Sequence, residues 1–117
     1  MKYLCLIYDA ESTQDAMSPT DLGAFLGEYG TFTKDIIASG NMISGEELQP
    51  VHTATTVRVR NGKLSTTDGP FAETKEQLGG FYLIEARDLN EAIQIASRIP
   101  SARTGSIEVR PIATPMG

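Results

Sequence analysis

Two well-marked helix starts, each preceded by a β-rich apolar segment, limit this chain to few folds. Ser18 is a typical N-cap residue and stands before a proline at the first helical position. Asp88 and Glu91 form a capping-box pattern. Apolar residues follow both starts at helical spacing, so the sequence predicts helices over residues 19–39 and 88–99.

The segments around these helices have the composition of β-strands. Residues 2–8 are nearly all apolar, as in a strand that is covered on both faces. Residues 54–60 alternate polar and apolar side chains and lead into Asn61-Gly62, a strong hairpin turn, so residues 63–67 form the return strand. Three further segments complete the set: a short strand or irregular edge at 42–48, and strands at 78–86 and 105–112.

The order strand, helix, several strands, helix, strand is that of an α+β, ferredoxin-like βαββαβ fold with both helices on one face of an antiparallel sheet. One domain over residues 1–117 is expected, because the chain is too short for two ordinary hydrophobic cores. The other sheet face would combine hydrophobic residues with Thr56, Arg58, Glu108 and Arg110. Two such faces packed together would enclose a polar cavity, so we predict a homodimer in the form of a dimeric α+β barrel.

Charge and composition argue against several function classes. The net charge is −5 and the ten Lys and Arg residues are scattered, so direct nucleic-acid binding is not expected. The apolar run before Asp9 is too short for a signal peptide or a membrane span, which favours a cytoplasmic protein without membrane contact.

Cofactor chemistry has little support in the sequence. Cys5 lies in an apolar strand pattern and is interpreted as a small buried residue, and His52 is the only histidine, so no zinc-ligand set exists. The chain has no P-loop, no dinucleotide-binding fingerprint after the first strand and no nucleophile elbow. We expect neither a metal nor a cofactor.

The most distinctive segment covers residues 67–81, where charged side chains are held between glycines and a proline. Gly69 can adopt positive φ and Pro70 fixes its own φ, so the pair would hold Asp68 in a defined direction as an acid, a base or an anchor. If a helical turn begins at Ala72, three side chains share its face: Glu73, Glu76 and Gln77. The alternative is an ordinary solvated surface whose charges stabilise the turn.

The string DGPFAETKEQLGGFYLIEA at residues 68–86, with LQP and TVR before it and NEA and EVRP after it, closely resembles the DGPF-domain branch of the YCII-related protein family. The resemblance covers nearly the whole chain. It implies a ferredoxin-like fold that pairs into a dimeric α+β barrel, with a cleft lined by the signature loop and by residues of the sheet.

The same resemblance implies two different functions. Some members of the wider family carry a histidine and aspartate pair early in the chain, which suggests catalysis, but no histidine precedes His52 here and that pair cannot be carried over. The DGPF branch is also similar to proteins found beside, or fused to, extracytoplasmic function sigma factors. That association suggests a regulatory or interaction module in transcription initiation.

Our first hypothesis is that the protein binds or converts a small polar or anionic molecule in a cleft at the dimer interface. Asp68 or Glu73 would accept a proton and His52 would assist its transfer. The ligand-binding group would then comprise Arg58 and Lys75, which could hold a carboxylate or enolate, together with Glu76.

Two further hypotheses stay open. The second is the interaction module with a sigma factor or another protein. The third is structural: Asp68 would cap the backbone of the turn that follows it, and salt bridges among Glu73, Lys75 and Glu76 would lock the loop across the dimer. The sequence does not decide whether the protein is an enzyme.

Overall fold

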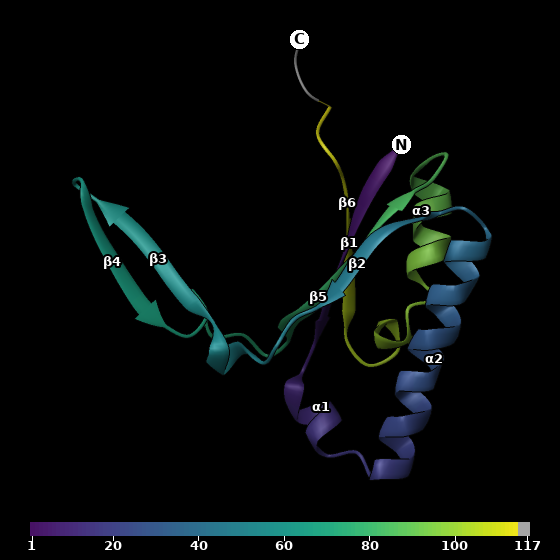
Figure 1. Cartoon of the computed structure of the whole chain (residues 1–117), viewed down its shortest axis with the longest axis horizontal. Helices are drawn as coiled ribbons and strands as arrows, with labels where there is room; N and C mark the ends of the chain where they lie inside the picture. Colours follow the sequence, from purple (N-terminus) through teal and green to yellow (C-terminus); the bar gives the residue numbers. More distant parts are fainter. Residues whose placement is uncertain (115–117) are drawn as a thin grey trace.

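A four-stranded antiparallel sheet, covered on one face by two helices, forms what we call the body of the molecule (Figure 1). The computed structural model describes residues 1–114. The sheet order is β2-β5-β1-β6, which confirms the predicted ferredoxin-like α+β fold. The elements of the body are β1 (Lys2–Asp9), α2 (Pro19–Ala38), β2 (Met42–Glu47), β5 (Gln77–Glu85), α3 (Leu89–Ala96) and β6 (Ser106–Pro111).

Local sequence explains where the two helices begin. The Ser18 hydroxyl accepts a hydrogen bond from the backbone N–H of Asp21 at 3.1 Å, and the Asp88 carboxylate accepts one from the backbone N–H of Glu91 at 2.9 Å. Both bonds satisfy amides that have no partner inside the helix. The capping residues identified in the sequence are therefore the residues that cap α2 and α3.

The core lies between the sheet and the helices. Strand β1 alternates, so that Tyr3, Cys5 and Ile7 are buried against the helices while the intervening side chains face the other way. Ile36 of α2 and Ile84 of β5 are fully buried in the same cluster. Alternating burial on the strands and one apolar stripe on each helix account for the single core of the body.

A second, two-stranded sheet projects from the body. It consists of β3 (Thr55–Arg60) and β4 (Lys63–Asp68), joined by Asn61 and Gly62 with φ values of 52° and 73°. This confirms the predicted hairpin, which we call the arm. The arm is inserted between β2 and β5 and extends on the side opposite the helices (Figure 1).

The insertion leaves the pairing of β2 and β5 intact. The backbone N–H of Leu48 donates to the carbonyl of Gly79 at 2.8 Å, directly where the chain leaves the body. Strand β5 already has β1 and β2 as its two neighbours, so it offers the arm no free edge. The arm therefore stands apart from the four-stranded sheet.

Two expectations from the sequence are wrong in detail. Thr56 and Arg58 lie on the arm rather than on the uncovered face of the main sheet, whereas Glu108 and Arg110 do lie there, beside Leu6 and Leu4 of β1. No helical turn follows Ala72, because the chain runs through bends until β5 begins.

Three short elements were not expected: helix α1 (Glu11–Asp15) and two 3₁₀ turns, η1 (Val51–Thr53) and η2 (Pro100–Ala102). Helix α1 has no side-chain cap at its start and no buried residue, so it lacks both of the usual sequence signals. No helix within residues 1–114 has the length and apolar character needed to cross a membrane.

The sheet face opposite the helices, which we call the open face, is apolar at its centre. Leu4 pairs with Leu83 and Leu6 pairs with Phe81, and all four side chains are only partly buried.

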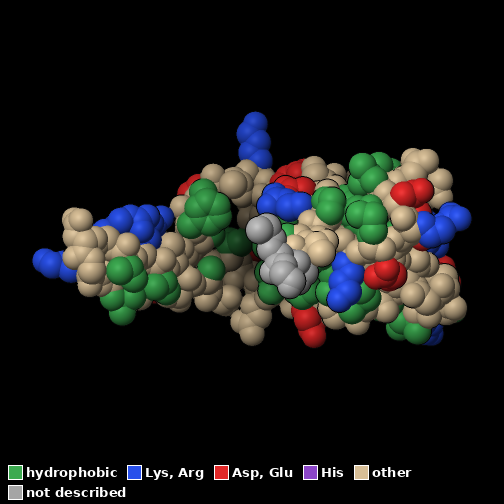
Figure 2. All heavy atoms as spheres, turned by 90° about the horizontal axis from the view of Figure 1, so that it is seen from above, with side chains coloured by type: hydrophobic (Ala, Val, Ile, Leu, Met, Phe, Trp, Pro, Cys, Tyr) green, Lys and Arg blue, Asp and Glu red, His purple; other side chains and the backbone are tan. Residues whose placement is uncertain are grey.

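The arm carries both basic and hydrophobic side chains. Seen from above, Lys and Arg side chains lie at its far end, next to hydrophobic ones (Figure 2).

Candidate functional site

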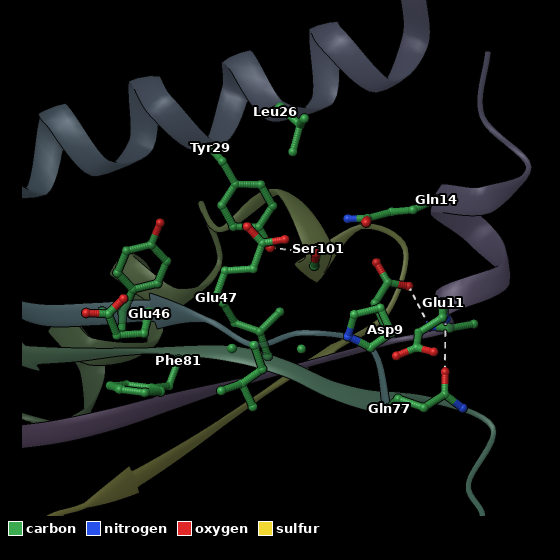
Figure 3. A pocket seen from close by; sticks show the side chains of 18 of the residues that line it. Asp9, Glu11, Gln14, Leu26, Tyr29, Glu46, Glu47, Gln77, Phe81 and Ser101 are labelled. Carbon is green, nitrogen blue, oxygen red and sulfur yellow. Dashed lines mark hydrogen bonds between the residues drawn. The ribbon is translucent and has the colours of Figure 1, made fainter. Parts of the chain in front are cut away.

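A cavity of about 600 Å³ lies on the helix-covered side of the sheet. Its walls come from α1, α2, the ends of β1 and β2, the start of β5, and the turns η1 and η2 (Figure 3). Leu26 of α2 and Gln14 of α1 extend into it from different elements (Figure 3). The cavity thus gathers residues from most of the chain around one space.

The lining is rich in carboxylates. Among residues 1–114, no Lys or Arg lines the cavity, so the acidic groups have only the imidazole of His52 as a basic counterpart there. Such a lining creates a negative potential, which attracts cations and repels anions. Within residues 1–114, no three His, Cys, Asp or Glu side chains lie close enough together to hold a metal ion. The acidic lining residues are Asp9, Glu11, Asp15, Glu46 and Glu47.

Asp9 is the last residue of β1 and is held firmly in place. Its Oδ1 atom accepts a hydrogen bond from the backbone N–H of Ala10 at 2.9 Å, and its Oδ2 atom accepts one from the Thr104 hydroxyl at 2.6 Å. Each carboxylate oxygen has further lone pairs. The half-buried carboxylate is therefore oriented and can still accept a hydrogen bond from a ligand.

His52 occupies the 3₁₀ turn η1 and lines the cavity with an exposed imidazole. The turn is attached to α1, because Oε2 of Glu11 accepts a hydrogen bond from the backbone N–H of Val51 at 3.0 Å. Glu11 in turn donates its backbone N–H to Oε1 of Gln77 at 2.9 Å. The Gln77 Nε2 atom donates to the carbonyl of Thr74 at 2.6 Å. This chain of bonds joins the histidine turn to Thr74, within the distinctive segment at residues 67–81.

Hydroxyl groups from facing elements meet in the cavity wall. The Tyr29 and Ser101 hydroxyls lie 2.6 Å apart, and those of Thr33 and Tyr82 lie 2.7 Å apart. Desolvation by burial raises the pKa of the Tyr29 phenol, so this group stays neutral and keeps its proton for hydrogen bonding. These pairs provide fixed polar contacts beneath α2 without adding charge.

The six site residues that the sequence predicts do not lie together in the structure. His52 lines the cavity, whereas the other five residues do not. Asp68 ends β4 and is exposed, as are Glu73 and Lys75. Their proposed roles, and those of Arg58 on β3 and Glu76, stay predictions.

Gly69 and Glu76, in the distinctive segment at residues 67–81, make hydrogen bonds that hold this segment to neighbouring parts of the fold. Gly69 has φ of 98° and donates its N–H to the carbonyl of Ala54 at 2.7 Å, and its own carbonyl accepts from the Thr56 hydroxyl at 2.8 Å. Glu76 accepts a hydrogen bond from the Ser106 hydroxyl at 2.8 Å. Within residues 1–114, no ion pair forms among Glu73, Lys75 and Glu76.

The sequence interpretation missed Asp9, Glu11 and Glu47, which supply carboxylates to the cavity. Asp9 and Glu11 carried a usable signal, since acidic residues at or just after the end of a buried strand stand at the edge of a sheet, where binding sites often form. Glu47 carried no such signal in the sequence. It comes close to the end of β1 only because the strands are ordered β2-β5-β1 in the sheet.

Known proteins are similar to this chain over nearly its whole length. The chain matches the YCII-related domain family over residues 1–115. It is also 38% identical, over 115 residues, to an uncharacterized protein of Rhizobium meliloti (strain 1021), covering 97% of this chain and 93% of the relative. Both matches extend over the body, the arm and the cavity residues alike. The chain belongs to the YCII-related family.

Proposed function

We propose that the protein binds a small polar molecule, either neutral or positively charged, in the cavity between α2 and the sheet, with His52 and Asp9 at the reacting end. The observation that carries this proposal is the combination of several carboxylates with one imidazole in a single cavity. Its volume of about 600 Å³ falls within the usual range for small-molecule sites.

The charge of the lining favours one of the two ligand classes considered from the sequence. A polar or cationic ligand would interact favourably with Asp9 and Glu47, whose carboxylates face the space beneath α2 (Figure 3). An anionic ligand would enter an acidic cavity to which the described part of the chain contributes no Lys or Arg. We therefore place a polar, non-anionic molecule in this site.

His52 is the group best suited to move a proton. An imidazole can gain and lose a proton near neutral pH and is the commonest general acid or base in enzymes. Its turn is held by the Glu11 and Gln77 hydrogen bonds, so the ring is carried on a fixed backbone. Asp9 would accept a hydrogen bond from the ligand, while the hydroxyls of Tyr29 and Ser101 would orient its other end.

Ligand charge can be tested directly by calorimetric titration with matched amines, alcohols and carboxylates of one carbon skeleton. We expect the amine and the alcohol to bind and the carboxylate to fail. Asp9→Asn should lower amine affinity by about tenfold or more, because a charged hydrogen bond becomes neutral. Asp35→Asn, which removes an exposed carboxylate of α2 outside the cavity, should change nothing. Equal binding of the carboxylate would contradict the proposal.

A second variant separates binding from catalysis. His52→Gln keeps a polar side chain of similar reach but cannot transfer a proton at neutral pH. If the bound molecule is a substrate, this variant should retain affinity and lose turnover. A variant with unchanged turnover would remove His52 from the mechanism while leaving the binding site in place.

A further inference from the structure

The turn of the arm combines two features that make an asparagine chemically unstable. Asn61 precedes Gly62, and glycine has no side chain to shield its backbone nitrogen from the asparagine side chain. Both residues are exposed at the tip of a hairpin that extends away from the body (Figure 1). The side-chain amide of asparagine is one of the thermolabile groups of proteins. At the tip of the arm, this side chain and the backbone beside it can therefore react with each other.

The backbone N–H of Gly62 is available for such a reaction. It stands between β3 and β4, and no hydrogen bond within residues 1–114 engages it. By contrast, Gly69, which follows Asp68, donates its N–H to the carbonyl of Ala54 at 2.7 Å. An N–H group in such a bond is not free to lose its proton and approach the preceding side chain. Asp68 is thus protected at the base of the arm, whereas Asn61 is not protected at its tip.

The other two asparagines of the chain lie in restrained positions. Asn90 is in α3, and the N–H of the following Glu91 donates to the Asp88 carboxylate at 2.9 Å. The Nδ2 atom of Asn41 donates to the carbonyl of Glu85 at 2.8 Å. These bonds hold either the attacking nitrogen or the side chain that would be attacked. Within residues 1–114, no hydrogen bond of this kind restrains the asparagine of the arm.

The charges beside the turn favour the reaction. The attacking nitrogen must lose its proton, and a nearby positive charge stabilises the anion that results. Arg60 precedes Asn61 and lies opposite Lys63, which follows Gly62. Neither basic side chain forms an ion pair within residues 1–114, so their charges are not neutralised there. The tip therefore has a positive local field in a chain whose net charge is −5.

The closed turn opposes the reaction, and opening of the arm removes this restraint. Asn61 and Gly62 have φ values of 52° and 73°, which fix the turn and limit the approach of the two groups. A two-stranded hairpin by itself is only marginally stable in water, and no residue of β3 or β4 is fully buried. Segments with so little burial open far more often than core strands. The native protein therefore exposes the reactive pair repeatedly.

We propose that Asn61 is a site of spontaneous deamidation, with water as the other reactant and with Arg60 and Lys63 promoting the first step. The Gly62 nitrogen loses its proton to solvent and forms a bond to Cγ of Asn61. The bond between Cγ and the side-chain nitrogen breaks, and that nitrogen takes up a proton and leaves as ammonia. The product is a cyclic succinimide. Water then opens the ring at either carbonyl, which gives aspartate or isoaspartate.

The two products have different effects on the arm. Asp-Gly is a preferred hairpin sequence, so aspartate keeps the turn and changes the formal charge of residues 55–68 from +3 − 1 = +2 to +2 − 1 = +1. Isoaspartate adds a methylene group to the main chain and does not fit a two-residue turn. The strands then lose the register that separates a basic face from an apolar one. The basic face comprises Arg58, Arg60 and Lys63, and the apolar face Val57, Val59 and Leu64.

The test is peptide mapping by mass spectrometry after the folded protein has been kept for days at mildly alkaline pH. Deamidation replaces NH₂ by OH, and isoaspartate is detected by methylation with an isoaspartyl methyltransferase. We expect conversion at Asn61, unchanged peptides for Asn41 and Asn90, and no isoaspartate at Asp68 until the chain is denatured. An unchanged Asn61, equal conversion of the three asparagines, or isoaspartate at Asp68 in the folded protein would each overturn the proposal.

A matched pair of lysine variants tests the part assigned to the charges. Lys63→Gln should slow the conversion of Asn61 by about two- to fivefold, the range expected for interactions between exposed charges. Lys34→Gln removes an exposed lysine of α2 and should leave the rate unchanged. Added salt should reduce the difference between the wild-type chain and Lys63→Gln. Equal rates in the wild-type chain and both variants would overturn the promotion of the first step by the basic residues.

Discussion

In the body, alternating strand residues such as Cys5 and Ile84 are fully buried, whereas in the arm, residues with the same alternation, such as Val57 and Leu64, are 60% and 70% exposed. Alternation gathers apolar side chains on one face in both places. Only the body has helices to cover that face. The pattern therefore identifies a strand and its faces, while the covering layer is decided by other parts of the chain or by another molecule.

The largest effect should come from removing a core side chain of the body. Ile84→Ala leaves a cavity in the core cluster that also contains Ile36 and should lower the free energy of unfolding by about 2–5 kcal/mol. Ser65→Ala, at an exposed position of the arm, should change it by less than about 0.5 kcal/mol. Urea denaturation in dilute solution measures both. Similar losses for the two variants would show that arm and body unfold as one unit.

A smaller and local effect should follow from changing the turn of the arm. Gly62 has φ of 73°, a conformation that costs a β-branched residue about 1–2 kcal/mol. Gly62→Val should therefore reduce the protection of β3 and β4 amides from hydrogen exchange. Amides of β1 and β5 should exchange as before, since those strands pair without the arm. Loss of protection in β5 would contradict the independence of the two regions.

The smallest effect is expected at Cys5, whose thiol should not react with a thiol reagent in the folded protein. Cys5 is fully buried, and burial raises the pKa of its thiol to about 11. Only the thiolate reacts, so a thiol reagent at about pH 8 should leave the folded protein unmodified. Labelling should occur at once in denaturant. Mass spectrometry checks this, and rapid labelling of the folded chain would mean that β1 opens as easily as the arm.

The elements of the body could be predicted from local signals. Ser18 and Asp88 mark the starts of α2 and α3, and the apolar run at residues 2–8 marks β1. These elements can be predicted because each signal depends only on residues that are close together in the sequence. Residues 11–15 form a helix too short to show periodicity. The separation of the arm could not be predicted, because it depends on which strands occupy the edges of β5.

The candidate site was harder to predict than the fold. The sequence indicates His52 because an imidazole suits proton transfer, and this residue does line the cavity. The sequence favours Asp68 because Gly69 and Pro70 fix its direction. The turn forms as expected, with Gly69 at positive φ, but Asp68 stands at the end of β4 and does not line the cavity. Rigid local geometry therefore located a turn correctly without locating a site, which depends on distant segments meeting.

The hydrogen bond between Leu48 and Gly79 has an implication for how such chains evolve. It closes the β2–β5 pairing beneath the arm, so insertions or deletions within the arm leave the framework unchanged. Side chains alternate along a strand, so gains or losses of two residues per strand keep the apolar and basic faces in register, while single-residue changes exchange them. Among related sequences, we expect arm length to vary in such even steps.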